Sequence, residues 1–185
     1  MKSLFGTLGV CCAGLVWLAG CQSVPLQGAA PGDAPVPVGT EVVLHRDLVI
    51  PPRSARTFIQ FGEVVPAVAQ YHPLCEFRVR GVSEEPRTVR AGRFTVVSIS
   101  RQERDIVRRG ARQLAALGIS IGMDGGQGDM IEYWLLWLKS ETQPDALWLA
   151  CAAGFDIPAR MRTPTLDEMR ATLGPVVTLE LPERR

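Results

Sequence analysis

The sequence has little net charge, two histidines and lysine only at Lys2 and Lys139, and each shortage excludes a class of function. Its 185 residues carry 20 Lys or Arg side chains against 19 Asp or Glu, a formal net charge of +1. A chain so balanced lacks the basic surface that non-specific nucleic-acid binding requires. It is also too apolar, at 46% hydrophobic residues, to be generally disordered. We therefore expect a folded domain and no nucleic-acid partner.

Motifs of the common enzyme classes are missing as well. The chain has no Gly-x-Ser-x-Gly elbow, no His-Glu-x-x-His pattern and no paired-carboxylate motif. The glycine-rich stretch Gly118–Met130 lacks the lysine of a phosphate-binding loop. We interpret it as a loop, either a plain connection or a lid. The sequence predicts no catalytic residue, and an enzyme with an unfamiliar site stays an alternative.

Residues 1–20 have the layout of a secretory signal. Lys2 is their only charged side chain, and an apolar run follows it as far as Gly20. A short positive start before an apolar stretch is typical of such signals. A transmembrane helix is the alternative, because residues 3–20 make 18 uncharged positions, the lower limit for spanning. The glycines within this run disfavour a spanning helix.

The apolar run ends in Leu18-Ala19-Gly20-Cys21, which resembles the lipobox of bacterial lipoprotein precursors. The resemblance implies that the signal is removed before Cys21, and that Cys21 carries covalent diacylglycerol and an N-acyl chain. Two or three acyl chains hold a protein on a membrane almost permanently, since each buried CH₂ contributes about 0.8 kcal/mol. The alternative is an ordinary cleaved signal followed by a chance cysteine.

The residue after the lipobox cysteine indicates where the protein is sorted. In Gram-negative lipoproteins an Asp at this position retains the protein in the inner membrane, and this chain has Gln22 there. The resemblance therefore implies the periplasmic face of the outer membrane, reached through the lipid anchor. No cofactor other than the covalent lipid is expected.

A tether over residues 21–40 is expected to precede a single β-rich domain over residues 41–185. Four prolines and three glycines between Gln22 and Thr40 favour a semi-extended linker. Beyond it, runs rich in Val, Ile, Phe and Trp alternate with turn residues, a pattern typical of strands. The predicted strands are Val42–Ile50, Ala55–Phe61, Cys75–Val82, Arg93–Ser100, Met130–Lys139, Leu147–Ala153 and Val176–Leu181.

These strands predict a mainly β fold, a small antiparallel sandwich or partly open barrel with one or two packed α-helices. The strands at Met130–Lys139 and Leu147–Ala153 are expected to form a hairpin, since Pro144-Asp145 signals a turn between them. Both are apolar on both faces, which predicts a central pair covered on both sides.

Two capping boxes predict the helices. Thr165 and Glu168 begin one helix, which Gly174-Pro175 ends. Ser100 and Glu103 predict a second, from Arg101 to Leu117, although Gly110 costs that helix about 1 kcal/mol relative to Ala.

Cys75 and Cys151 are the cysteines that remain after the signal and Cys21 are set aside. Both lie in predicted strands of a chain expected in an oxidising compartment, so we predict a disulfide between them. Two free buried thiols and thiol redox catalysis are the alternatives, and the usual Cys-x-x-Cys spacing of redox sites is missing.

The histidines and arginines suggest weaker alternatives. His72, His45 and Cys75, with Met123 or Met130, are a possible copper or zinc ligand set. We expect no metal site, because two histidines are few and a disulfide would consume the thiol. Two groups of arginines have the same two interpretations: the stretch Arg101–Arg112, and Arg53 with Arg56. Each group would either face anionic lipids or polymers or form ordinary solvated surface.

Three further stretches carry a resemblance in the mature domain. IPPRSARTFIQFG, YHPLCEFRV and LWLAC resemble proteobacterial lipoproteins that are small secreted β domains with one cysteine in each half. No function is carried over to this chain from that resemblance.

We expect a lipid-anchored, non-catalytic periplasmic domain that binds or scaffolds another envelope component, a protein or a polymer. The alternative is a carrier or sensor of an apolar small molecule in a cavity within the β domain. Its candidate ligand-binding residues are those of the apolar hairpin: Trp134, Trp137, Trp148 and Tyr133.

Overall fold

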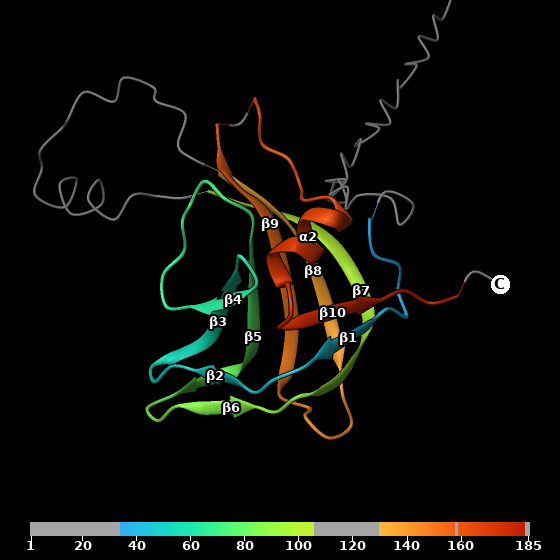
Figure 1. The fold of residues 1–185 in the computed structure, drawn as a ribbon. Coiled ribbons are helices and arrows are strands. Elements are labelled where there is room, and N and C mark those ends of the chain that lie inside the picture. The colour runs from blue at the N-terminus through green and yellow to red at the C-terminus, as the bar shows by residue number, and fades with distance from the viewer. Residues whose placement is uncertain (1–33, 106–129, 158, 184–185) are drawn as a thin grey trace, which may run out of the picture.

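The computed structural model describes residues 34–105, 130–157 and 159–183, and it is mainly β (Figure 1). The strands are β1 (Glu41–Leu44), β2 (Leu48–Ile50), β3 (Ser54–Gln60), β4 (Glu63–Val65), β5 (Leu74–Ser83), β6 (Arg87–Val89), β7 (Gly92–Asp105), β8 (Met130–Lys139), β9 (Ala146–Asp156) and β10 (Val177–Glu180). One helix, α2 (Leu166–Leu173), is present in the described part of the chain.

Eight of the strands form one antiparallel sheet in the order β10-β1-β7-β8-β9-β5-β3-β4, while β2 and β6 pair separately. The large sheet curls around its core, and α2 packs over the open side (Figure 1). Of the two architectures that the sequence predicted, a sandwich or a partly open barrel, the structure has the partly open barrel with a packed helix. The predicted hairpin is β8 and β9, and it lies in the middle of the sheet.

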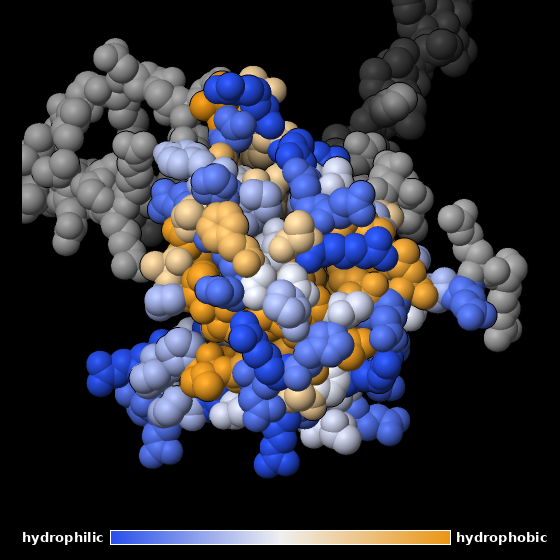
Figure 2. Space-filling model, viewed as in Figure 1, coloured by the Kyte–Doolittle hydropathy of each residue, from blue (hydrophilic) through white to orange (hydrophobic). Residues whose placement is uncertain are grey.

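The main hydrophobic core fills the inside of the curl. Phe77 and Phe94 meet there edge to face, with ring centroids 5.6 Å apart. Met169 and Leu173 of α2 are fully buried against the same cluster. Hydrophilic residues predominate over β2 and β6 at the lower end of the molecule (Figure 2). Nearer α2, apolar side chains are visible among the hydrophilic ones.

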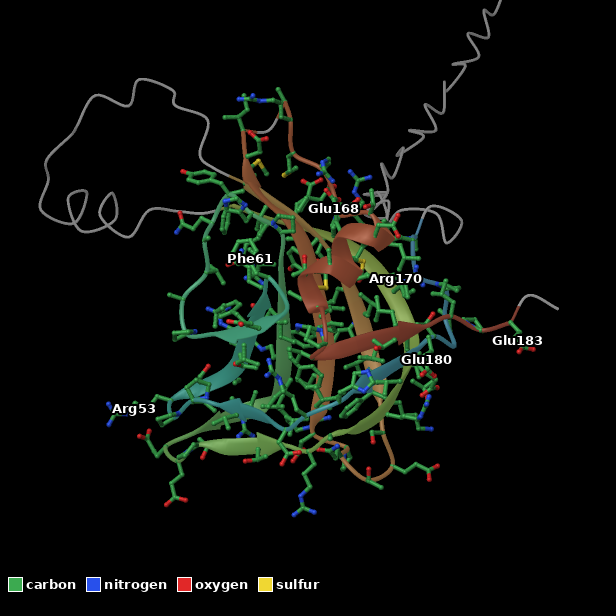
Figure 3. The ribbon with its side chains drawn as sticks, viewed as in Figure 1. Arg53, Phe61, Glu168, Arg170, Glu180 and Glu183 are labelled. Atoms are coloured by element: carbon green, nitrogen blue, oxygen red, sulfur yellow. A yellow bond between two sulfur atoms is a disulfide. The ribbon has the colours of Figure 1, made fainter. Side chains whose placement is uncertain are left out.

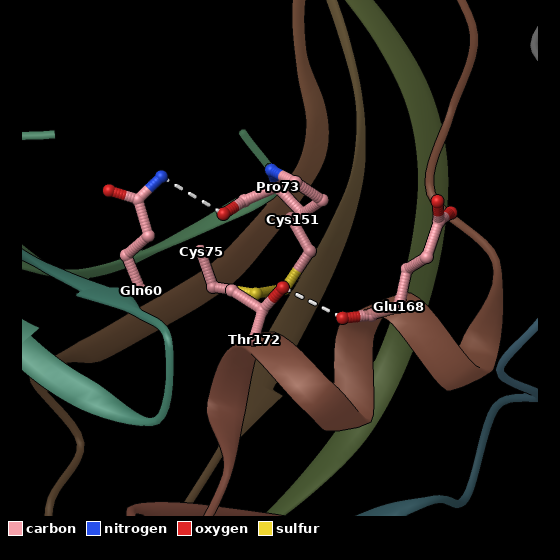
Figure 4. Close-up of a disulfide and its surroundings, with 6 residues drawn as sticks. All are labelled: Gln60, Pro73, Cys75, Cys151, Glu168 and Thr172. Carbon is pink, nitrogen blue, oxygen red and sulfur yellow. Dashed lines mark hydrogen bonds between the residues drawn. A yellow bond between two sulfur atoms is a disulfide. The ribbon is translucent and has the colours of Figure 1, made fainter. Parts of the chain in front are cut away.

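The predicted disulfide is present between Cys75 and Cys151. The two residues face each other directly in the ladder of β5 and β9, and both side chains point into the core. The helix α2 lies beside the disulfide, and the Thr172 hydroxyl donates to the Glu168 carbonyl at 2.7 Å there (Figure 4). The cross-link therefore joins two neighbouring strands inside the core.

The predicted capping box is confirmed at the start of α2. The Thr165 hydroxyl accepts from the Glu168 backbone N–H, and the Thr165 backbone N–H donates to the Glu168 carboxylate at 2.8 Å. Arg162 donates to the same carboxylate at 2.7 Å. The hydrogen bond from Arg162 is the main reason that the pKa of Glu168, which Figure 3 labels, falls to about 2.

The prediction of a second helix is wrong for residues 101–105, the part of it that the structure describes. Residues 101–105 continue β7 and pair with β8, from Arg101 opposite Trp134 to Asp105 opposite Met130. The fully buried Glu132 of β8 forms an ion pair with Arg101, which holds this part of β7 in the sheet. Sheet pairing thus overrides the local capping signal of Ser100 and Glu103. Residues 106–117 lie outside the described residues.

Two further boundaries differ from the predictions. The strand expected at Val42–Ile50 is divided, because the chain turns at His45–Asp47 and β2 joins a different sheet. The folded domain also begins before Glu41. Val36 is only 1% exposed, packs in the core, and lies within the predicted tether.

Within the described residues, no helix has the length and apolarity needed to cross a membrane.

Candidate ligand-binding pocket

Strand alternation gives the sheet two chemically different faces. On β5 and β9, Cys75 and Cys151 point into the core, whereas their chain neighbours Leu74 and Ala152 form a second cluster on the opposite side. We call that opposite side the outer face. Successive strand residues point to opposite faces, so one stretch of sequence supplies both.

A pocket of about 240 Å³ opens on the outer face; we call it the outer-face pocket. Its apolar lining comes from the four strands β3, β5, β8 and β9 and from the β4–β5 loop: Phe58, Val68, Leu74, Ile131, Ala150, Ala152 and Phe155. Its polar lining consists of Arg56, Glu76, Arg104 and Tyr133. The small side chains of the two alanines leave the space that their aromatic neighbours enclose.

Two arginines flank the pocket, each held over an aromatic ring. The Arg56 guanidinium lies 5.2 Å from the Phe58 ring centroid. The Arg104 guanidinium lies 5.3 Å from the Tyr133 ring centroid, and it reaches the Tyr133 hydroxyl at 3.4 Å. Cation–π contacts of this kind contribute about 0.5–1 kcal/mol at exposed sites. They keep both charges beside the apolar lining.

Glu76 is a nearly buried carboxylate in the pocket lining. Its Oε2 accepts a hydrogen bond from Arg56 Nη1 at 3.0 Å, and its Oε1 lies 3.5 Å from Arg78 Nη1. Its side chain is only 9% exposed, and within the described residues Oε1 accepts no hydrogen bond. Two guanidinium groups therefore compensate this one negative charge.

Gln60 fixes the segment that carries Val68. Its buried side-chain amide donates to the Ala69 carbonyl at 3.0 Å and to the Pro73 carbonyl at 3.1 Å, and it accepts from the Ala69 N–H at 2.8 Å (Figure 4). Buried polar groups that are fully paired in this way hold a loop in one conformation. The Val68 side of the pocket is thus anchored to β3.

Gly154 allows the same segment to approach β9. Its φ is +113°, and a Cβ there would lie 3.0 Å from the Tyr71 backbone. Only glycine adopts this conformation without strain. Next to it, the Phe155 N–H donates to the Gln70 carbonyl at 2.8 Å. A register shift between Ile131 and Tyr133 in the β8–β9 ladder accompanies this bend and brings Phe155 to the pocket.

The predicted ligand-binding residues are divided between the two faces. Trp134 lies opposite Cys151 and is buried in the core. Trp137 and Trp148 face each other on the outer side, with ring centroids 4.9 Å apart. Tyr133 lines the outer-face pocket. The four side chains do not line one chamber, because residues an odd number of positions apart in β8 point to opposite faces.

The histidines of the possible metal site lie on different segments. The His45 ring is hydrogen-bonded to the Thr178 hydroxyl at 2.7 Å. The His72 ring instead meets the exposed Phe61 at the β3–β4 turn, and Figure 3 labels Phe61. Cys75 is in the disulfide. In the described part of the chain, no group of three His, Cys, Asp or Glu side chains is placed to hold a metal ion.

The arginines singled out from the sequence also have different surroundings. Arg53 is exposed and pairs with Glu84 at 3.0 Å, whereas Arg56 lines the pocket. Arg101 pairs with Glu132. Cys21 of the predicted lipobox and residues 118–129 of the glycine-rich stretch lie outside the described residues.

Sequence reasoning missed most of the pocket, including Phe58, Leu74, Glu76, Ala150 and Ala152. One signal was present: Ala150, Ala152 and Gly154 are small residues at alternate positions of a central strand. Small residues at such positions leave room on one face that larger neighbours can border.

The chain matches no protein-family model, no curated protein and no solved structure.

Proposed function

We propose that this chain is a lipid-anchored domain of the Gram-negative envelope, and that it binds another envelope component through the outer-face pocket. The role is binding rather than catalysis. The anchor is the lipid on Cys21, and the location is the periplasmic face of the outer membrane.

The disulfide supports an oxidising location. Cys75 and Cys151 are directly opposed in adjacent strands, and both are buried in the core. Structural disulfides persist in the periplasm and are rare in the reducing cytosol. This agrees with the signal and lipobox at the start of the chain, which independently predict export.

The outer-face pocket carries the proposal of a binding role. Its lining is mostly apolar, yet it includes three charged side chains: Arg56, Glu76 and Arg104. An apolar concavity with a few convergent polar groups is typical of binding sites. Aromatic and arginine side chains, which recur around this pocket, are also enriched where proteins bind their partners.

The mostly apolar lining of the pocket favours a second candidate function, a carrier or sensor of an apolar small molecule. A volume of about 240 Å³ is just below the usual range for small-molecule sites, about 300–1,000 Å³. In this version the ligand lies on the outer face beside Tyr133, rather than among the tryptophans of the hairpin.

Photo-crosslinking in living cells tests the binding role. A photoreactive phenylalanine analogue at Phe155 lies in the pocket lining, and the same analogue at Val49 lies exposed on β2 as the control. We expect a specific adduct with an envelope component from position 155 and none from position 49. We also expect Ala152→Phe, which fills the pocket, to abolish the adduct. Equal adducts from both positions, or none from either, would overturn the proposal.

Mass spectrometry of the purified native protein tests the anchor separately. The expected N-terminal peptide begins at Cys21 and carries the diacylglycerol and the N-acyl chain. A different N-terminus, or an unmodified Cys21, would refute the anchor and leave the crosslinking result to be judged by itself.

A further inference from the structure

We infer that the outer-face pocket takes an anionic amphiphile, a molecule with an acidic head group on an apolar chain. The inference rests on the proposed binding role of this pocket and names the chemistry of what it binds. Three features carry it: the apolar floor, the balance of charge around it and the position of Arg104.

The floor suits a hydrocarbon chain. Leu74, Ile131, Ala150 and Ala152 form it, and all four are buried among their neighbours. They offer no hydrogen bond from a side chain, so a polar ligand group placed there would lose its water without compensation. At about 240 Å³, the space accepts one chain or one ring rather than a larger molecule.

The charges around the floor favour an anion. Among the described residues that line the pocket, Arg56 and Arg104 stand against one carboxylate, that of Glu76, and Arg78 lies 3.5 Å from the same carboxylate. Glu76 is already compensated, because Arg56 and Arg78 both lie within 3.5 Å of its oxygens. A cationic ligand that approached Glu76 would have to come close to these guanidinium groups, which opposes its binding.

Arg104 is the side chain that would meet the acidic head. Its guanidinium lies over the Tyr133 ring, at the edge of the apolar lining. Within the described residues it forms no ion pair with a carboxylate, in contrast to Arg56. A carboxylate or phosphate oxygen placed there would gain a charge-assisted hydrogen bond, which is roughly twice as strong as a neutral one.

Three photoreactive probes with the same ten-carbon, diazirine-bearing chain test this assignment: a carboxylic acid, an alcohol and a primary amine. They are applied to membrane vesicles that contain the full-length protein, and labelling of β8 and β9 is measured by mass spectrometry. Arg104→Gln removes the proposed head-group contact. Arg46→Gln removes the same charge from the exposed β1–β2 loop, outside the pocket lining, as the matched control.

We expect the acid to label the pocket several times more than the alcohol, and the amine least. Arg104→Gln should lower the acid-to-alcohol ratio by about fivefold, the effect of losing one exposed ion pair of about 1 kcal/mol. Arg46→Gln should leave the ratio unchanged. Using the ratio within one membrane preparation cancels a general effect of a variant on folding or on vesicle yield.

Preferential labelling by the amine, a wild-type ratio near one, or a ratio that Arg104→Gln leaves unchanged would overturn the assignment. If no probe labels the pocket while the crosslink from Phe155 still depends on Ala152, the ligand class is wrong and the proposed function stands. If the probes label as expected but Cys21 carries no lipid, the envelope anchor is wrong and the ligand class stands.

Discussion

The two faces of β5 and β9 use neighbouring residues for different purposes. On the inner face, Cys75 and Cys151 are joined covalently in the sealed core. On the outer face, one residue away in each strand, Glu76 and Ala152 line an open pocket. Because a strand alternates its side chains, one set can seal the core while the other lines a pocket on the opposite face. The two sets of side chains can therefore vary separately in this fold.

The faces also differ in what covers them. The inner face is closed by α2, whose Met169 and Leu173 are fully buried against the core. On the outer face, Arg56 and Arg104 lie over their own neighbouring rings and leave the pocket between them. Trp137 on that face is still 38% exposed. The outer face therefore keeps an open pocket where the inner face is closed.

Removing the disulfide should have the largest effect on the inner face. The bond links residues that are 76 positions apart, and closing a loop of this length lowers the entropy of the unfolded chain. Replacing Cys75 and Cys151 by Ala should lower the free energy of unfolding by about 4 kcal/mol, measured by urea denaturation. The wild-type protein in a reducing agent is the control and should lose stability comparably. Unchanged unfolding midpoints in both would contradict the structural role of the bond.

Substitutions of two phenylalanines on adjacent strands allow the stability contributions of the two faces to be compared directly. Phe77 of β5 is fully buried in the core, whereas Phe58 of β3 is half-buried at the pocket. Phe77→Ala should cost about 3–4 kcal/mol of unfolding free energy, because it leaves a cavity in the core. Phe58→Ala should cost about 1 kcal/mol and reduce labelling of the pocket instead. If the two variants lose equal stability, the division of roles between the faces fails.

Much of the fold could be predicted from local sequence. The strand at Met130–Lys139 and the Thr165–Glu168 capping box are signalled by residues within a few positions, and the structure has both. The disulfide followed from the small number of cysteines. The failure at Arg101 was different in kind, since its strand conformation depends on Glu132 in another strand. Local capping signals contain no information about such a partner.

The pocket was harder to predict for the same reason. Phe58, Leu74, Ile131 and Ala152 are far apart in sequence and become neighbours only through the order of the strands. The tryptophans are large and apolar, which predicts one cluster, but strand alternation places Trp134 and Trp137 on opposite faces. Which side chains share a face depends on the strand register.

The helix that closes the inner face provides the smallest and most specific test. Glu168 fixes the start of α2 through Arg162 and the Thr165 N–H, and its pKa is lowered from 4.5 to about 2. Since the folded state prefers the charged form, this stabilisation is fully present above about pH 4.5 and disappears as the pH falls through about 2.

Glu168→Gln should therefore lower the unfolding free energy by about 1–2 kcal/mol near neutral pH. The difference from wild type should shrink steadily between about pH 4.5 and about pH 2, as followed by urea denaturation. Asp167→Asn is the matched control, because its carboxylate is 94% exposed and lies 3.9 Å from Arg170. It should change stability by only a few tenths of a kcal/mol.

Because α2 packs on the inner face alone, probe labelling of the outer-face pocket should be unaffected in both variants. A loss of probe labelling in Glu168→Gln but not in Asp167→Asn would show that the two faces are coupled.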